Sequence, residues 1–395
     1  MFHRRPTGLH IIPHEAGTSL ARLSAIEGLA RSILVGVVPL MALEALGSKQ
    51  AVTNAYLAGS ILTLLITLNF TSLEKWLQRR WVVTLGGVFL VLAAALLYSS
   101  KGLGFSLGIG LRSAAASLFS VCLSLYIMDY IGKRELAWVE SKRLVYTGAG
   151  WLIGPTLGIW LWNHMADWTP FALAGVCGIA MLAYFWHLRL GSNVVVTRAK
   201  NSSVNPLKII PRYFSQSKLR IAYLITLSRS IFWVSLFVYG PIYVVEAGMP
   251  QWMAGGLLSF VSGLLFFSPL IRQLAEHIGT RKTILIGQFI CAGSVFGLFL
   301  LPAPSVYGIG LWILASIGGA MLDVMGNIPF MRMVKPRERT EMTMIFSTWR
   351  EGSELLTPLL AACILLFLPF EWFYLLLAVL LLCAAIASSY LPRRL

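Results

Sequence analysis

Long apolar runs recur along this sequence and limit what it can fold into. Runs of about 20 mainly apolar residues follow one another from residue 23 to residue 391, and a helix of about 20 residues crosses the hydrocarbon core of a bilayer. Only helices or closed barrels satisfy their backbone polar groups in lipid. Because the runs are continuous rather than alternating, they favour helices over barrel strands. The sequence therefore predicts an all-α polytopic membrane protein.

Composition agrees with this class. The 395 residues are 57% hydrophobic and only 12% charged, with a mean hydropathy of +0.76, whereas soluble domains carry about 25% charged residues. The first 22 residues are polar and basic, so we expect no cleaved signal peptide. The cysteines are scattered through the apolar runs and predict small packing residues rather than a disulfide, a metal site or a cofactor: Cys122, Cys177, Cys291, Cys363 and Cys383.

Twelve spans are predicted, and the polar, basic stretch 190–219 divides them six and six. The predicted organisation is a cytoplasmic tail at 1–22, a six-helix bundle at 23–189, a cytoplasmic linker at 190–219 and a second six-helix bundle at 220–395. The predicted spans are 23–46, 51–72, 81–100, 104–128, 143–163, 169–189, 220–245, 252–271, 283–301, 305–329, 342–368 and 371–391.

Lys and Arg residues predict the orientation. If the N-terminus is cytoplasmic, the outside loops hold only Lys49 and Lys101. The positive-inside rule then places both termini in the cytoplasm, and we expect a multi-pass protein of a bacterial cytoplasmic (inner) membrane. The net charge of +16 is explained by these short basic loops, so we expect no nucleic-acid partner.

The chain also repeats itself. Three stretches of the first half return in the same order in the second, which predicts two related halves with a binding site between them. Glu44 and Glu246, each near the end of the first span of its half, also correspond. The pairs are ARSI at 30–33 with SRSI at 228–231, LEKWLQRR at 73–80 with AEHIGTRK at 275–282, and the segments that begin at Gly132 and Lys335.

With these motifs the chain resembles the major facilitator superfamily over its full length, and its motifs are most similar to the twelve-span drug–proton antiporter branch. The resemblance implies two pseudo-symmetric six-helix bundles that act as a monomer by alternating access. The residues that carry it are Arg112 in LRSAAAS, Gly150, Gly154, Pro155 and Gly158 in GWLIGPTLG, and Glu276, Gly279, Arg281 and Lys282 in a gating motif. A second copy of the gating motif keeps Glu74, Arg79 and Arg80 but has Leu77 in place of the glycine.

Ionisable residues inside the spans are the candidate site. A central Arg costs roughly 2.5–3.5 kcal/mol on insertion scales, so each one needs a wet cavity or a partner. The resemblance places four of them on spans that line a central cavity. We predict substrate binding by Arg31, Arg112, Arg229, Asp323 and Trp233, and proton coupling by Glu27, Asp323 and Glu354. Glu27 and Arg31 are one helical turn apart, and so are Arg350 and Glu354.

Three functional hypotheses stay open. The first is proton-coupled export (antiport) of a small amphiphilic organic compound. The second is transport of an organic anion, a phosphate ester or carboxylate, held between Arg31 and Arg229, because Arg-rich pockets prefer anions. The third is a polytopic membrane enzyme or receptor, but the sequence contains no HExxH, GxSxG or paired-His motif, so we expect no enzymatic activity. The predicted partners are therefore a small-molecule substrate, protons and the lipid bilayer.

Overall fold

The structure is a computed structural model that describes residues 13–99, 102–130, 136–188, 206–335, 338, 342 and 345–392. Regular structure in these ranges is helical, without strands. Ten of the described helices are long and apolar enough to cross a membrane. Most of the predicted tail at 1–22 and the first part of the predicted linker, residues 190–205, lie outside the described residues.

Each of the twelve predicted spans has a counterpart among these helices, so the predicted fold class is confirmed. The first six are α1 (Pro13–Leu46), α2 (Lys49–Leu68), α3 (Phe70–Ser99), α4 (Leu103–Tyr130), α5 (Leu136–His164) and α6 (Thr169–His187). A short helix α7 (Pro206–Ser215) lies within the predicted linker. The second half contains α8 (Ser217–Glu246), α9 (Gln251–Gly263), the 3-10 turn η1 (Leu264–Phe267), α10 (Ser268–Ile278), α11 (Thr280–Leu300), α12 (Val306–Met325), α13 (Ile328–Met333), α15 (Trp349–Leu365) and α16 (Glu371–Ser388).

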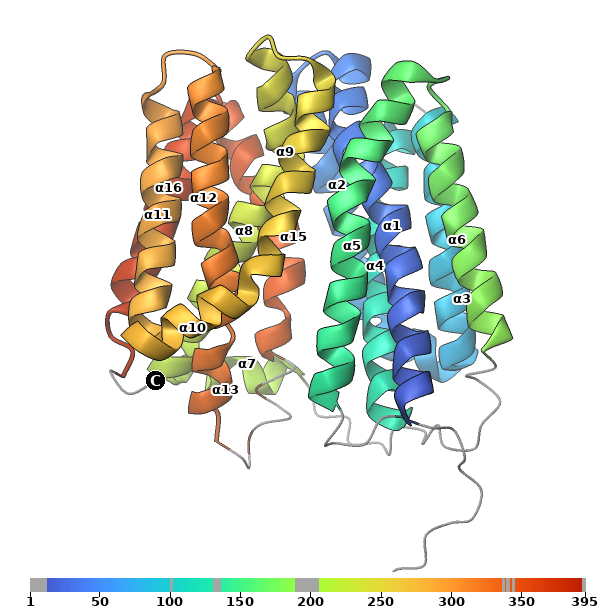
Figure 1. The fold of residues 1–395 in the computed structure, drawn as a ribbon, viewed down its shortest axis with the longest axis horizontal. Coiled ribbons are helices and arrows are strands. Elements are labelled where there is room, and N and C mark those ends of the chain that lie inside the picture. Colours follow the sequence, from blue (N-terminus) through green and yellow to red (C-terminus); the bar gives the residue numbers. More distant parts are fainter. Residues whose placement is uncertain are drawn as a thin grey trace, which may run out of the picture.

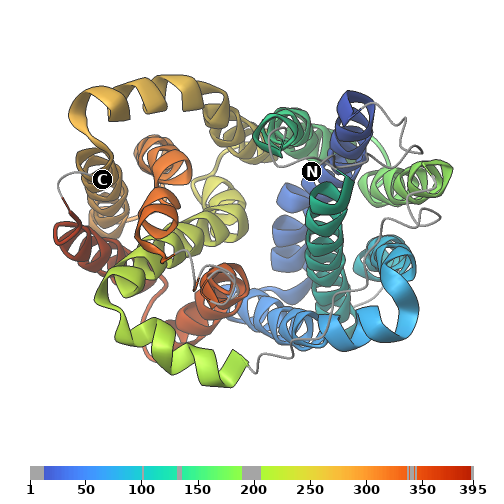
Figure 2. The same cartoon turned by 90° about the horizontal axis from the view of Figure 1, so that it is seen from below.

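The helices form two bundles that lie side by side (Figures 1 and 2). In the first, α1 packs against α4, α5 and α6; in the second, α8 packs against α9, α12, α15 and α16. The halves meet mainly where α5 packs on α9 and where α15 packs on α2. Helices α5 and α15 are the two predicted spans that are not among the ten described helices long and apolar enough to cross a membrane. Both pack against the other half, so their polar side chains can face protein instead of lipid.

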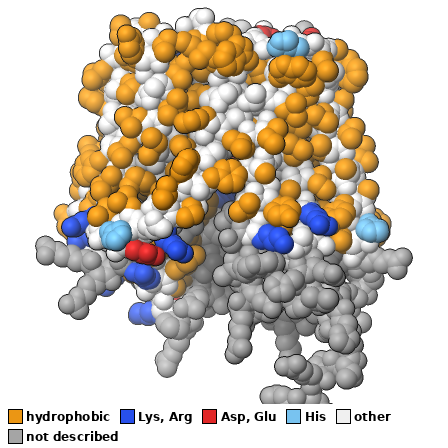
Figure 3. Space-filling view, in the orientation of Figure 1, with side chains coloured by type: hydrophobic (Ala, Val, Ile, Leu, Met, Phe, Trp, Pro, Cys, Tyr) orange, Lys and Arg blue, Asp and Glu red, His pale blue; other side chains and the backbone are white. Residues whose placement is uncertain are grey.

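Apolar side chains cover the face of the molecule seen in Figure 3. Hydrophobic side chains cover most of the helices, and Lys and Arg side chains gather along the lower edge (Figure 3). Large apolar side chains are exposed in the second half, such as Phe260, Phe267 and Ile286. This arrangement fits a surface covered by hydrocarbon, with cations at one interface.

The two halves are joined at the end where α1 finishes and α2 begins. Lys49 Nζ lies 2.7 Å from Glu246 Oε2, and Gln251 Nε2 donates a hydrogen bond of 3.2 Å to Glu44 Oε1. Glu44 and Glu246 correspond in the sequence repeat, and Lys49 and Gln251 each follow them by five residues. These four residues, which we call the clasp, are two pseudo-symmetric contacts that hold this end closed.

Candidate functional site

A cavity of about 160 Å³ lies between the two halves. Side chains of α1, α2, α4 and α5 line it from the first half, and side chains of α8 and α15 from the second. Its charged lining residues are Arg31, Arg112 and Glu354. The cavity therefore combines the two halves with both signs of charge, which is the arrangement expected of a binding site between repeats.

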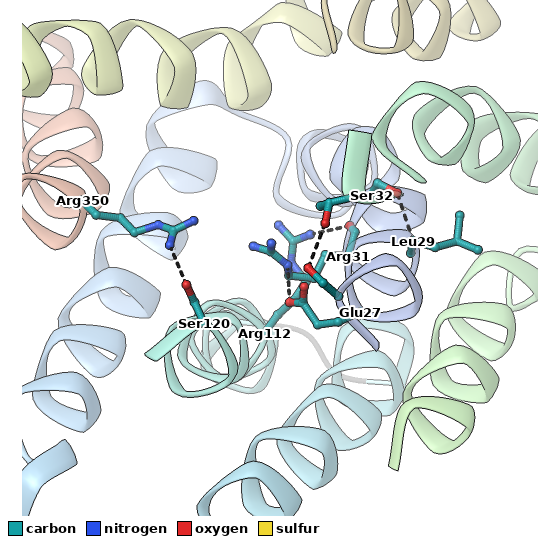
Figure 4. A network of polar contacts seen from close by, with 9 residues as sticks. Glu27, Leu29, Arg31, Ser32, Arg112, Ser120 and Arg350 are labelled. Carbon is teal, nitrogen blue, oxygen red and sulfur yellow. Dashed lines mark hydrogen bonds and ion pairs between the residues drawn. The ribbon is translucent and has the colours of Figure 1, made fainter. Parts of the chain in front are cut away.

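Arg31 reaches the cavity with a partner from its own helix. Its Nε lies 2.5 Å from Glu27 Oε1, one turn earlier in α1, and its guanidinium carbon lies 5.6 Å from the centre of the Trp151 ring. The Arg31 side chain keeps 21% of its surface exposed, while Glu27 is almost fully buried. The predicted turn spacing thus forms an ion pair, and the charge of Arg31 is largely neutralised (Figure 4).

Arg112 forms no ion pair with an acidic side chain among the described residues. It enters from α4, and its Nη1 donates a hydrogen bond of 3.1 Å to the backbone oxygen of Arg31. Its Nε is buried and has no hydrogen-bond partner among the described residues. A desolvated guanidinium with unused donors is costly unless a bound anion supplies the missing charge and acceptors.

Glu354 brings a carboxylate to the same cavity from α15. The backbone oxygen of Glu354 accepts a hydrogen bond of 2.7 Å from Ser60 of α2, which ties this turn to the first half. Arg350 lies one turn earlier but donates to Ser120 Oγ of α4 at 3.3 Å (Figure 4). Within the described residues no ion pair joins Arg350 to Glu354, although the sequence spacing would allow one.

Arg229, Asp323 and Trp233 lie outside the lining of this cavity. Arg229 is buried, with its Nη1 3.2 Å from Asp323 Oδ1 of α12 and its guanidinium carbon 5.0 Å from the centre of the Trp349 ring. Trp233 stacks on Phe237, whose ring does line the cavity. The structure therefore brings Arg31 together with Arg112, and the Arg31–Arg229 clamp expected from the repeat is not formed. Arg229 is paired instead with Asp323, outside the cavity.

The glycine motif of α5 positions α1. A Cβ added at Gly154 would collide with Ser32 Oγ, and one at Gly158 with the backbone oxygen of Ile33. Ser32 Oγ also donates a hydrogen bond of 2.9 Å to the backbone oxygen of Gly150. Because Ser32 directly follows Arg31, this close approach fixes the turn of α1 that carries the cavity guanidinium.

The same segment of α5 contacts the second half with its opposite face. Thr156 Oγ1 donates a hydrogen bond of 2.8 Å to Ser259 Oγ of α9, and the backbone oxygen of Pro155 lies 2.9 Å from where a Cβ of Gly255 would be. Sequence reasoning missed Thr156 and Ser259. The sequence holds no signal for this pair, because it does not show that α5 and α9 pack against each other.

The two copies of the gating motif differ in structure. In the first, Arg79 Nε lies 2.9 Å from Glu74 Oε1, and the buried guanidinium carbon lies 5.4 Å from the centre of the Tyr126 ring. In the second, Glu276 pairs with Arg272 at 3.4 Å, and both side chains are largely exposed. Arg80 lies beside Trp81, and Arg281 and Lys282 lie in the first turn of α11.

The backbone corrects one prediction about these copies. Gly279 has φ +92° and ψ 144°, and the matching break within α3 falls at Gln78, with φ +60° and ψ 150°. The residue with the backbone conformation of Gly279 is therefore Gln78 and not Leu77. It lies one position after the residue that the sequence comparison pairs with the glycine. This backbone region is almost exclusive to glycine, so Gln78 is strained.

The family model of the major facilitator superfamily matches residues 20–349 and, in a second match, residues 260–394. No curated protein matches the chain. Among solved structures, the nucleoside transporter NupG is 14% identical with a TM-score of 0.75, over 95% of this chain and 98% of that chain. A POT family transporter in complex with 5-aminolevulinic acid is 12% identical with a TM-score of 0.78, over 94% and 95%. A bacterial homologue of the iron transporter ferroportin, in an inward-facing state, is 19% identical with a TM-score of 0.67, over 96% and 99%. At these identities the structures establish a shared fold.

Proposed function

The chain belongs to the major facilitator superfamily of transporters, and we propose that it is a secondary active transporter whose central cavity binds a small organic anion. The observation that carries this proposal is Arg112, a buried cavity guanidinium without an acidic partner among the described residues. Arg31 lies beside it but is already paired with Glu27. The anion site thus consists of Arg112 supported by Arg31, instead of the Arg31–Arg229 pair.

The chemistry of arginine suits this role. Its planar guanidinium offers donors in a fork that matches a carboxylate or phosphate, and it stays charged at any physiological pH. Nη1 of Arg112 donates the hydrogen bond to the backbone of α1, and its buried Nε has no partner among the described residues. A bound carboxylate would satisfy the remaining donors and the charge together, which is a strong form of hydrogen bonding.

Alternating access would use the contacts between the halves. The clasp closes one end of the interface through Lys49, Glu246, Glu44 and Gln251, and the cavity lies between the same two bundles. Opening the clasp while the opposite end closes would change the side from which Arg112 is reached. Under the predicted orientation the closed end faces outward, and both termini are cytoplasmic.

Proton coupling is assigned to Glu354. Of the three predicted proton carriers, Glu27 and Asp323 each have an arginine partner within 4 Å, whereas Glu354 lines the cavity without an ion pair in the described residues. Its negative charge would repel a substrate anion in the same cavity. A proton on Glu354 removes this repulsion, so anion and proton would bind together and move in the same direction.

Proton-driven export of an amphiphilic compound (antiport) is the second candidate. The close packing of Gly154 and Gly158 on α1 favours it, because this α5 motif resembles that of the antiporter branch. In this mechanism a cationic or neutral substrate would contact Glu354 and displace its proton. The two candidates thus differ in the charge of the ligand and in the sign of the proton exchange.

One binding experiment separates them. Purified protein is screened by thermal shift and intrinsic tryptophan fluorescence against small organic anions, their neutral amides and organic cations. We expect anions to bind, and we expect Arg112→Gln to lower their affinity by about 100-fold or more. In weakly buffered solution the protein should take up protons when the anion binds. Glu354→Gln should bind the anion without proton uptake.

The matched control is the double variant Arg229→Gln/Asp323→Asn, which removes a buried ion pair outside the cavity and should keep anion binding. If a cation or neutral compound binds and releases protons, and Arg112→Gln leaves its Kd unchanged, the anion proposal is wrong and the antiport candidate gains support. A panel in which no anion binds contradicts the proposal as well.

A further inference from the structure

We propose that the transported anion is an aromatic monocarboxylate, whose ring lies against Trp151 and Phe237 while its carboxylate reaches Arg112. This inference rests on the proposed function and narrows its substrate class. Two independent features of the cavity carry it. One is the balance of charge in the lining, and the other is the aromatic wall formed by Trp151 and Phe237.

The charge balance selects a ligand with one negative charge. Arg31 is neutralised by Glu27, Arg350 is turned toward Ser120 and does not line the cavity, and Glu354 contributes a carboxylate. When Glu354 is protonated, as the proposed proton coupling requires, one uncompensated cation, Arg112, remains. A carboxylate matches it, whereas a phosphate ester with two charges would leave one of them unpaired and close to Glu354.

Another part of the lining is apolar and aromatic. Helix α8 contributes Val234, Phe237 and Val238, and α5 contributes Trp151. The ring centroids of Trp151 and Phe237 lie 5.3 Å apart at an interplanar angle of 60°. Such a wall binds an apolar body and leaves the hydroxyl groups of a sugar without partners, because a polar group buried without hydrogen bonds is costly.

Neighbouring groups hold these two rings in place. Trp151 lies below the Arg31 guanidinium, and Phe237 stacks on Trp233 at a centroid distance of 5.8 Å. Each ring therefore has one edge or face packed against protein before any ligand arrives. Preformed aromatic surfaces favour edge-to-face or offset contacts with another ring, which add about 0.5–1.5 kcal/mol beyond burial of area.

A tyrosine gives the carboxylate end a second contact. Tyr56 of α2 lines the cavity and is close enough to Arg112 to interact with its charge. The other tyrosine of the lining, Tyr239, shares a hydrogen bond of 3.1 Å with Thr53. Tyr56 is thus the hydroxyl that would donate to the second carboxylate oxygen, so the ligand's polar end lies toward α2 and α4 and its ring toward α5 and α8.

The test compares four probes by isothermal titration calorimetry of the purified full chain: benzoate, cyclohexanecarboxylate, benzamide and phenyl phosphate. We expect benzoate to bind about 2–10-fold more tightly than cyclohexanecarboxylate, the range that an aromatic pair supports. Benzamide and phenyl phosphate should bind more weakly than both carboxylates.

Two variants locate the aromatic contact. Phe237→Leu and Trp151→Leu should each reduce the preference for benzoate to less than twofold while cyclohexanecarboxylate keeps its Kd within about twofold, which also shows that the site is folded. Phe260→Leu, at an exposed aromatic residue of α9 outside the cavity, is the matched control and should keep the preference.

The outcomes distinguish this inference from the proposed function. Equal binding of the two carboxylates, both lost in Arg112→Gln, would overturn the aromatic inference and leave the anion transporter intact. Tighter binding of phenyl phosphate, or a benzoate preference that persists in both leucine variants, would overturn it too. Failure of all three anions to bind would contradict the proposed function itself.

Discussion

Arg31 and Arg229 occupy the same position in the two halves of the sequence repeat, yet their surroundings differ. Arg31 lines the central cavity with part of its surface exposed. Arg229 is buried, and its charge is matched by Asp323 from a different helix. The comparison teaches that a repeat preserves the place of a residue in the sequence but not its surroundings, since one arginine lines the cavity and the other forms a buried ion pair between helices.

The partners explain the difference. Glu27 is one turn from Arg31 on the same helix, so this pair can form while the guanidinium still faces the cavity. Asp323 belongs to α12 and holds Arg229 against it, with an added hydrogen bond of 3.4 Å to the backbone oxygen of Leu322. An ion pair between two helices holds the arginine between them, whereas an ion pair within one helix lets the guanidinium face the cavity.

The largest expected effect is loss of stability when either pair is broken. Arg229→Gln should lower the free energy of unfolding by about 3 kcal/mol, because Asp323 loses its partner in a mostly buried site. Asp323→Asn added to this variant should recover most of the loss. Thermal unfolding in detergent measures both changes, and no recovery in the double variant would contradict the pairing.

Two double variants, each of which removes one of the two ion pairs, test the difference between Arg31 and Arg229 directly. Glu27→Gln/Arg31→Gln should weaken anion binding by about tenfold or more, since it removes the guanidinium donors of Arg31 beside Arg112. Arg229→Gln/Asp323→Asn should change Kd by less than about twofold. Equal losses in the two double variants would show that both arginines contact the ligand and would restore the clamp expected from the repeat.

The gating motif offers a second contrast between the halves. Gln78 holds a backbone conformation that costs about 1–3 kcal/mol for residues other than glycine. Gln78→Gly should therefore raise the unfolding free energy by about 1 kcal/mol, and Gly279→Ala should lower it by a similar amount. Gln78→Ala is the control and should give no gain, and thermal unfolding of the three variants checks the signs.

The clasp should give a smaller effect because its residues are only partly buried. Lys49 and Glu246 form an ion pair, whereas the related contact between Gln251 and Glu44 has only one charge. Gln251→Lys would make the two contacts alike and stabilise the closed end by about 0.2–1 kcal/mol. Hydrogen exchange at the start of α2 and α9 should slow in this variant and quicken in Lys49→Gln; the opposite order would contradict the clasp.

The smallest effect is expected at α7. Hydrogen bonds from Gln216 and Arg212 hold the pKa of Glu338 below its usual range. A lowered pKa in the folded state stabilises the protein above the ordinary Glu pKa, and this contribution is lost as the pH falls through the lowered value. In Glu338→Gln, the free energy of unfolding should therefore fall less as the pH is lowered below about 4.5. Thermal unfolding as a function of pH measures this, and a profile equal to that of the unsubstituted protein would contradict the contact.

Several parts of the site could be predicted from the sequence, for local reasons. The turn spacing of Glu27 and Arg31 predicted that they share one face of a helix, where the structure pairs them, and the glycines at 150, 154 and 158 allow the close helix packing that the structure has. The aromatic wall was missed because Trp151 and Phe237 stand in apolar runs, where rings facing lipid and rings facing a cavity look alike. The positive φ at Gln78 was missed because an alignment by residue type placed the break one position earlier.

The sequence by itself determined the class of the protein, since twelve apolar runs without water for their backbone can only become helices, and the repeat determined that there are two halves. Only the tertiary structure decided which charges meet. Partners for Arg229 and surroundings for Arg112 come from helices far away in the chain. The energy of a buried charge depends on those neighbours within a few ångströms, and a linear pattern contains no such distances.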